Sequence, residues 1–255
     1  MAAAKDHSPT HPADCPRRSF VYRKLLAAGA GGFVKVGDAM AADNYGDLEG
    51  ERLRAGCAGL VDLCPMPRIG FKGKGCLDWL RAAGLRVPDA PNRSAAQEDG
   101  AIIATLDKDS ALVLGNPRTA GGDPLPAKLQ ARWSGGDPSP PPWGLPLHWQ
   151  DSHAWYLLTG ARTPEVLAGL CSMDLRPQHF PEGGVAQTSV AHLGTVVIRE
   201  ATGGGQPAYH LLADSAAAGY FYDELQAAVA EFGGGPAGLR VLRAAPTKQR
   251  EGAGP

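Results

Sequence analysis

The chain has 255 residues, of which 34 are glycine and 22 are proline, a share of turn-forming residues that argues against long coiled coils and large helical bundles. Lys and Arg number 25 against 26 Asp and Glu, so the net charge of −1 argues against a nucleic-acid partner, which needs a basic face. The hydrophobic share of 44% suffices for one large domain or two small ones.

Nothing in the sequence points to a membrane or to secretion. No run of about 18 apolar residues occurs, so we expect no membrane span and no membrane partner. The N-terminus has no apolar run after a positive start, and it does not resemble a secretory signal. The five cysteines, at positions 15, 57, 64, 76 and 171, are scattered without a C-x-x-C pair, which favours a reduced, cytoplasmic protein.

The first half of the chain is predicted to be an α+β subdomain at 18–133, preceded by a flexible tail at 1–17. Hydrophobic periodicity, with Asp47 as a helix cap, predicts these elements. The helices are expected at 18–30, 47–56, 75–83 and 126–133, and the strands at 33–36, 59–63, 68–72, 101–106 and 111–114.

A Pro- and Gly-rich linker is predicted at 134–146, because its proline density forbids a helix. It separates a second α+β subdomain at 147–245 from the first, and a flexible tail follows at 246–255. The expected helices of this half are 163–170 and 215–232, and its strands are 154–158, 184–192, 194–199, 207–212 and 239–242. A faint echo of 69–80 in 155–167, strand then Gly then helix, suggests two similar sheet-plus-helix units.

Motifs of common catalytic chemistry are absent from the sequence, which has no P-loop, no G-x-S-x-G and no H-E-x-x-H. Asp151, Ser152 and His153 stand side by side, but neighbours on a strand point to opposite faces and cannot form a relay. They are interpreted as the polar start of a strand, with an interface or a ligand-facing turn as the alternative. Cys171 follows a helix and is expected to be a small buried hydrophobic residue. We therefore predict no catalytic residue, no cofactor and no metal on this chain.

Several segments together resemble the gamma subunit of heterotetrameric sarcosine oxidase. They are 160–175, with its Cys-x-x-Asp-Leu stretch, His179-Phe180-Pro181, and 185–188, with its Ala-Gln-Thr. Upstream, 91–93 and 103–114 also match, and the likeness covers about residues 55–243. That family is related to the folate-binding aminomethyltransferase fold. Residues 55–63 resemble the opening strand of that fold.

The resemblance implies a non-catalytic partner of alpha, beta and delta subunits. In such complexes FAD, FMN, NAD, tetrahydrofolate and zinc are expected on the partner subunits, and none on this chain. Folate-binding relatives carry a Gly-Glu-x-Gly-Tyr-Glu segment whose carboxylate binds the pterin, since a carboxylate accepts two parallel N–H donors. The corresponding residues 203–210, Gly-Gly-Gly-Gln-Pro-Ala-Tyr-His, contain no acid.

Two hypotheses follow. The first is a non-catalytic structural subunit of a flavin-dependent, folate-linked sarcosine oxidase or related N-methyl amine oxidoreductase. The second is a stand-alone tetrahydrofolate-dependent demethylase or aminomethyltransferase-like enzyme, which would need a carboxylate from Asp62, Asp107 or Asp214. A turn explains Asp107 better, and a helix cap explains Asp214 better.

A subunit interface is expected to use polar and aromatic groups on loops and strand starts. The candidate interface residues are Arg68, Asn92, Arg93, His153, Phe180, Gln187 and Thr188. Trp155 is expected to be a core residue.

Overall fold

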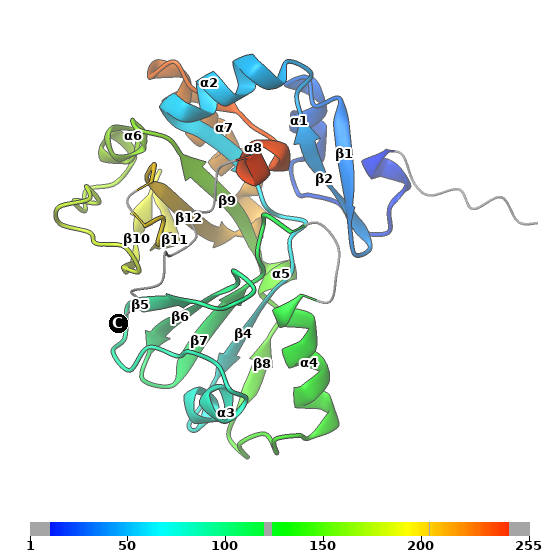
Figure 1. Cartoon of the computed structure of the whole chain (residues 1–255), viewed down its shortest axis with the longest axis vertical. Helices are drawn as coiled ribbons and strands as arrows, with labels where there is room; N and C mark the ends of the chain where they lie inside the picture. The colour runs from blue at the N-terminus through cyan, green and yellow to red at the C-terminus, as the bar shows by residue number, and fades with distance from the viewer. Residues whose placement is uncertain (1–10, 120–123, 204, 245–255) are drawn as a thin grey trace, which may run out of the picture.

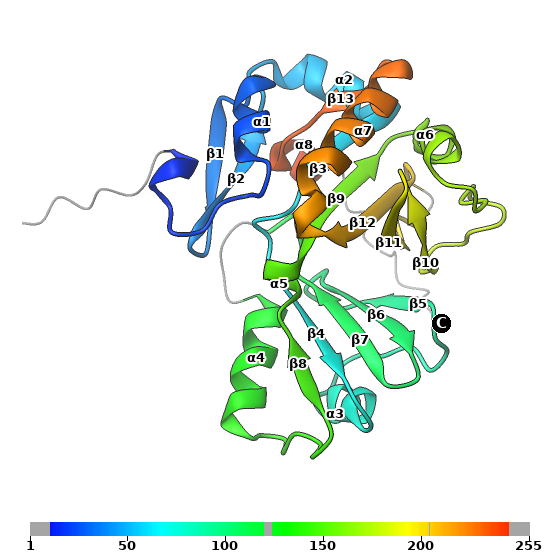
Figure 2. The same cartoon turned by 180° about the vertical axis from the view of Figure 1, so that it is seen from behind.

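The computed structural model describes residues 11–119, 124–203 and 205–244. It contains a two-stranded hairpin and two larger sheets, which lie one above the other in the views of Figure 1 and Figure 2. The upper sheet is built from β3 (Gly59–Asp62), β9 (His153–Thr159), β10 (Val185–Val190), β11 (Leu193–Arg199), β12 (Ala208–Asp214) and β13 (Gly235–Pro236). The lower sheet is built from β4 (Arg68–Lys72), β5 (Arg93–Ala96), β6 (Ile102–Asp107), β7 (Ser110–Leu114) and β8 (Leu145–Leu147).

Helices and one hairpin complete the fold. The α-helices are α1 (Tyr22–Ala27), α2 (Leu48–Ala58), α3 (Cys76–Ala82), α4 (Leu125–Gly135), α5 (Trp149–Ser152), α6 (Thr163–Leu170), α7 (Ala218–Glu231) and α8 (Leu239–Ala244). Two short 3-10 helices are η1 (Pro12–Asp14) and η2 (Ser215–Ala217), and the hairpin is β1 (Gly32–Val36) with β2 (Ala39–Asn44). Asp47 caps α2, as predicted, by accepting a hydrogen bond from the backbone N–H of Gly50 at 3.0 Å.

The expected repeat is confirmed by the topology. The upper sheet has the order β10-β11-β12-β9-β3-β13, and the lower sheet has the order β5-β6-β7-β4-β8. The segments β4-α3-β5-β6-β7-α4 and β9-α6-β10-β11-β12-α7 therefore run the same course, and the last strand of each returns beside the first. Gly73 and Gly160 follow the first strands at φ values of 122° and 119°, which favour glycine at both turns.

The two sheets exchange one strand each. β3 directly precedes β4 in the chain but pairs with β9, whereas β8 precedes β9 but pairs with β4. The sheets therefore do not follow the predicted division at 134–146, where α4 ends and β8 begins. Hydrophobic pattern marks a strand but does not identify the strand that it pairs with, so this exchange could not be read from the sequence.

Three clusters of buried side chains form the core. One lies between the upper sheet and α6 and α7, where the rings of Tyr156 and Phe221 are 5.7 Å apart. Another lies between the lower sheet and α3 and α4, and it contains Phe71, Trp79 and Trp133. The third fills the space between the two sheets and also receives side chains from the hairpin and α8. No helix within the described ranges has the length and apolar character needed to cross a bilayer.

Three local expectations are corrected. Residues 239–242 form the helix α8 and not a strand, because Leu239 and Leu242 are buried three positions apart on one helix face. Within residues 11–17 of the predicted tail, Pro12 is buried and Cys15 is only 3% exposed, so these two side chains pack against the fold. The strands β2 and β5 were not expected. The predicted tail at 246–255 lies outside the described residues.

Candidate functional site

The junction between the two sheets brings together candidate residues from distant parts of the sequence. The chain passes from the upper to the lower sheet at residues 62–68 and returns at residues 147–153. Arg68, the first residue of β4, lies where these two crossovers meet and is only 2% exposed.

The guanidinium of Arg68 connects both crossovers. Its Nη1 donates to the carbonyls of Cys64 and Met66 at 3.0 and 2.9 Å. Its Nε donates to the carbonyl of Trp149 at 3.2 Å, and its Nη2 donates to those of Gln150 and His153. Burial lowers the pKa of Arg68 to about 10, so the side chain stays charged at neutral pH. The donors of the Arg68 guanidinium are therefore used by hydrogen bonds within the chain. This corrects the expected role of Arg68 on a subunit interface.

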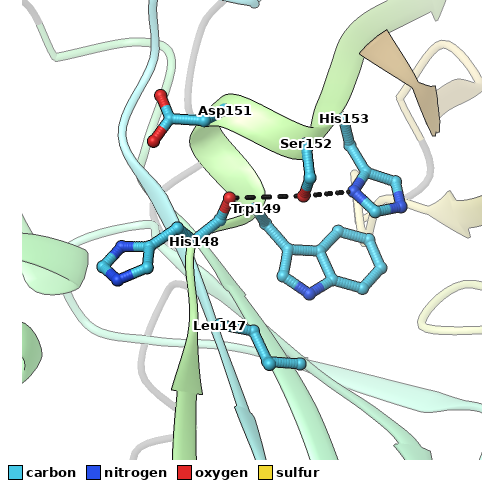
Figure 3. A pocket seen from close by; sticks show the side chains of 6 residues that line it. All are labelled: Leu147, His148, Trp149, Asp151, Ser152 and His153. Atoms are coloured by element: carbon cyan, nitrogen blue, oxygen red, sulfur yellow. Dashed lines mark hydrogen bonds between the residues drawn. The ribbon is translucent and has the colours of Figure 1, made fainter. Parts of the chain in front are cut away.

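A hollow of about 580 Å³ opens at the second crossover, shown in Figure 3. Its lining consists of Leu147, His148, Trp149, Asp151, Ser152 and His153. The ring of Trp149 stacks on that of His153, with centroids 3.9 Å apart and planes at 14°. Burial, reinforced by the charge of Arg68, lowers the pKa of His153. The stacked pair of rings thus presents a flat, uncharged π-surface at neutral pH, with Asp151 beside it in the same lining.

Ser152 and His153 are in hydrogen-bond contact in the lining of the hollow. The Ser152 hydroxyl lies 2.8 Å from Nδ1 of His153 and 3.2 Å from the carbonyl of His148. The tautomer of His153 decides whether its Nδ1 donates to the serine oxygen or accepts the hydroxyl proton, and a serine nucleophile needs the second arrangement.

A second contact joins the free edges of the two sheets. The side-chain amide of Gln187 on β10 donates to Oδ1 of Asn92 at 3.0 Å and to the carbonyl of Leu106 at 2.9 Å. Arg93 forms an antiparallel bridge with Gly184, next to this contact. The sequence predicts a subunit-interface role for Asn92, Arg93 and Gln187. The structure places them where two sheets of one chain meet, with all three side chains exposed.

The remaining two candidates lie in or near the upper core. Phe180 is 4% exposed and stacks on Tyr209 with planes at 10°, so it is a core residue and its expected place on a subunit interface is corrected. Its ring also rests against Gly184, where a Cβ atom would lie 2.9 Å from Cε2. Thr188 is half-buried, with its hydroxyl 3.8 Å from Sγ of Cys171. Trp155 is fully buried, as expected.

A buried polar chain crosses the space between the sheets, and sequence analysis identified only part of it. Trp155 donates its indole N–H to Nδ1 of His210 at 3.1 Å. Nδ1 is thereby an acceptor, so the ring proton lies on Nε2, which faces Oε2 of Glu200 at 3.6 Å. Arg118 binds the other carboxylate oxygen of Glu200 at 2.5 Å. The local sequence pattern does not indicate a role for Glu200 or Arg118, because the two residues that form this contact are 82 positions apart.

The carboxylates of the second hypothesis have structural roles or stay inaccessible. Asp107 accepts from the N–H of Asp109 in the hairpin turn at 2.7 Å, and Asp214 caps η2 through the N–H of Ala216 at 2.8 Å, both as predicted. Asp62 is 2% exposed, and burial raises its pKa although the Cys64 N–H bond opposes this. Within the described ranges, no three His, Cys, Asp or Glu side chains gather as a metal site would require.

Two solved structures are similar to this chain. One is a chain of the heterotetrameric sarcosine oxidase from Corynebacterium sp. U-96 in complex with pyrrole 2-carboxylate. It matches with a TM-score of 0.60 and 21% identity, over 85% of this chain and 96% of that chain. The other is glycine cleavage system aminomethyltransferase T from Bartonella henselae, with a TM-score of 0.66 and 16% identity over 89% of this chain. This chain has the aminomethyltransferase-like fold.

The match covers 62% of the Bartonella protein, so the chain spans less than two thirds of that length. No family model and no curated protein matches the sequence. The resemblance to the sarcosine oxidase gamma subunit and the aminomethyltransferase-like fold is consistent with both solved structures. At these identities the likeness concerns the fold.

Tetrahydrofolate does not fit the residues that the aminomethyltransferase-like fold presents here. The stretch that the resemblance aligns with the pterin-binding segment, 203–210, offers Gln206 and His210 in place of an acid. His210 is fully buried, and its two ring nitrogens face Trp155 and Glu200. An imidazole cannot accept two parallel N–H donors, and no solvent reaches it. The neighbouring indole of Trp155 is also fully buried, so side chains fill the space between the sheets.

Proposed function

We propose that this chain is the non-catalytic, gamma-type structural subunit of a sarcosine oxidase or a related N-methyl amine oxidoreductase. The complex would be flavin-dependent and folate-linked. Its partners would be alpha, beta and delta type subunits, and it would assemble in the cytoplasm. The likeness to a chain of a heterotetrameric sarcosine oxidase, over 96% of that chain, supports this choice. The five free cysteines agree with a reducing compartment.

The observation that carries the proposal is the buried His210. A folate enzyme of this fold needs an accessible carboxylate at the pterin position. The corresponding stretch of this chain, 203–210, has Gln206 and His210 instead, and His210 is 0% exposed and bonded to Trp155. The acidic group beside it, Glu200, is held by Arg118 and turned into the core. The accessible carboxylate that the second hypothesis, a stand-alone folate enzyme, requires is therefore missing from this stretch.

The chemistry of such a complex would take place on other chains. The amine would be oxidised to an imine by a flavin on a partner subunit, and the one-carbon unit would leave as formaldehyde or pass to tetrahydrofolate. This chain would contribute a rigid body. Its two sheets are joined at Arg68 and at the Asn92–Gln187 contact, and both connections keep a partner-facing surface in one shape.

The test uses the full chain with an affinity tag, expressed in its own cells beside its natural partners. We expect flavin-containing subunits to co-purify and the complex to oxidise sarcosine or another N-methyl amine. The purified chain alone should give no heat with tetrahydrofolate in calorimetry. Folate binding and one-carbon transfer by the isolated chain would establish the stand-alone enzyme instead.

A further inference from the structure

Trp143 is the most exposed large hydrophobic residue in the described part of the chain, at 77%. Of the other four tryptophans, Trp79 and Trp155 are buried, and Trp133 and Trp149 are half-buried. Leu145, two residues along on β8, is also exposed, at 64%. Single exposed apolar residues are common, but a tryptophan beside a leucine at the edge of a sheet is an apolar patch that needs an explanation.

Hydrogen bonds and close packing hold the backbone around Trp143 in place. Residues 141–144 form a turn closed by the bond from the Gly144 N–H to the Pro141 carbonyl at 2.9 Å. Trp79 donates its indole N–H to the carbonyl of Pro138 at 2.7 Å. Gly144 lies so close to the ring of Trp133 that a Cβ would be 2.7 Å from it. Trp143 is thus presented on an ordered turn, so little backbone entropy is lost when a partner binds it.

The edge strand itself is unsuited to adding a further strand. Its register pairs Pro146 with Phe71, between the pairs Gly70–Leu147 and Lys72–Leu145. Proline has no N–H, so the backbone hydrogen bonds to β4 come from the residue pairs on either side of Pro146. The backbone of Pro146 therefore faces the open edge and offers no N–H donor to a further strand. A partner would therefore contact the side chains of this edge and not extend the sheet.

The apolar edge continues into the hollow of Figure 3. Leu145 and Leu147 point to the same face because they are two residues apart on β8. Leu147 in turn lines the hollow together with the stacked rings of Trp149 and His153. We name these residues, Trp143, Leu145, Leu147, Trp149 and His153, the β8 surface. It combines an exposed indole with an open, shallow hollow of about 580 Å³.

Charge at this edge indicates the chemistry of the partner. Lys72 pairs with Leu145 across the strands, and Gly73 contacts the backbone of Trp143, so Lys72 and Lys74 flank the patch. Both lysines are exposed, and Lys72 lies close enough to Asp107 for its charge to lower the pKa of that carboxyl, which leaves Lys74 as the cation available to a partner. A protein surface that fits here has an apolar pocket for an indole and carboxylates at the rim of that pocket.

The geometry points to the β8 surface as the docking site for a partner subunit of the complex, with Trp143 inserted into an acidic-rimmed apolar pocket of that subunit. This inference rests on the proposed function. Tryptophans in the centre of an interface commonly provide a large part of its affinity.

The experiment titrates this chain into the remaining subunits of the complex, prepared without it, and measures the dissociation constant. Trp143→Ala should weaken binding by about thirtyfold or more. Leu53→Ala is the matched control, since Leu53 is 70% exposed but lies on α2, far along the chain from β8, and it should change binding by less than about threefold. Lys74→Glu should weaken binding by about tenfold, and more strongly at low salt.

Thermal unfolding of each variant shows that the fold is intact, because the replaced side chains are exposed. If wild type binds and Trp143→Ala binds equally well, the β8 surface is not the docking site. An equal loss with Leu53→Ala would likewise overturn it. If wild type binds no flavin-containing subunit at all, the proposed function fails and the docking site fails with it.

Discussion

Arg68, the first residue of β4, donates a hydrogen bond to the carbonyl of His153, the first residue of β9. These two strands begin the two copies of the repeat, so one side chain fastens the starts of both copies to each other. Four further carbonyls, those of Cys64, Met66, Trp149 and Gln150, accept from the same guanidinium. This buried cation therefore helps to fix the relative position of the two sheets, together with the Asn92–Gln187 contact at their free edges.

Replacing Arg68 with methionine should lower the free energy of unfolding by about 3 kcal/mol or more, because five buried carbonyls lose their donor. Urea unfolding measures the change. Arg81→Met is the matched control, since Arg81 pairs with the exposed Asp78 and Asp89 and makes one long bond to the Pro88 carbonyl, and its loss should cost less than about 1 kcal/mol. Similar costs for the two variants would show that Arg68 does not hold the junction.

Gly70→Ala tests the packing of the hollow. A Cβ at Gly70 would lie 2.6 Å from Nε1 of Trp149, so the indole must move and its stack on His153 must break. We expect a cost of about 1–3 kcal/mol and an altered near-ultraviolet circular dichroism signal. Gly56→Ala, in α2 with no atom within 4 Å of the new Cβ, should instead stabilise by about 0.5–1 kcal/mol. An unchanged spectrum for Gly70→Ala would contradict the observed contact.

Local pattern predicted much of the fold. The strand 68–72 and the helix 163–170 agree with the structure residue for residue, because each has a clear period and clear boundary residues. The repeat was visible in the glycines at 73 and 160, where the chain must turn with positive φ. The prediction of a strand at 239–242 was wrong, because a four-residue apolar segment with Leu239 and Leu242 fits a strand and a helix equally well.

The candidate site was predicted less completely, because its contacts join distant residues. Asn92 and Gln187 were both named, but the bond between them spans 95 residues and no local pattern indicates it. Glu200 was not named at all, since a lone glutamate after a strand is typical of a solvated surface. Only the topology of the upper sheet turns it toward His210. Burial of Arg68 was equally hidden, because arginine is rarely buried unless paired.

Phe180→Ala should destabilise the isolated chain by about 3–4 kcal/mol, because it leaves a cavity beside Tyr209. The folded fraction should still join the complex, since the side chain reaches no surface. Chemical unfolding gives the first value, and titration of the partner subunits gives the second. His179→Ala, an exposed neighbour, should change the stability by less than about 0.5 kcal/mol. Weakened assembly of folded Phe180→Ala would return this residue to the interface.

The Asn92–Gln187 contact predicts measurable coupling between the two sheets. Asn92→Gly and Gln187→Ala, alone and together, form a double-mutant cycle in urea unfolding. Glycine is chosen because Asn92 has a φ of 58°, which alanine would adopt only with strain. The coupling free energy should be about 0.5–1.5 kcal/mol, the usual value of one neutral hydrogen bond. Additive losses would mean that the amide contact does not connect the sheets.

The buried Glu200 predicts how stability depends on acid. Burial alone would raise its pKa, but the facing His210 and the Arg118 guanidinium outweigh burial and lower it from 4.5 to about 2. A carboxyl whose pKa is lower in the folded state stabilises the fold above its unfolded pKa, and this contribution is lost as the pH falls toward 2. The difference corresponds to roughly 3 kcal/mol, because one pKa unit is about 1.4 kcal/mol.

Wild type should therefore lose about 3 kcal/mol of stability between about pH 5 and 2 that Glu200→Gln does not lose. Asp62 acts in the opposite direction, since burial raises its pKa, but it is present in both proteins and cancels in the comparison. Urea unfolding at a series of pH values measures both curves. Glu231→Gln, at the exposed end of α7, is the control and should follow wild type. Parallel curves for wild type and Glu200→Gln would show that the Glu200–Arg118 pair does not stabilise the fold.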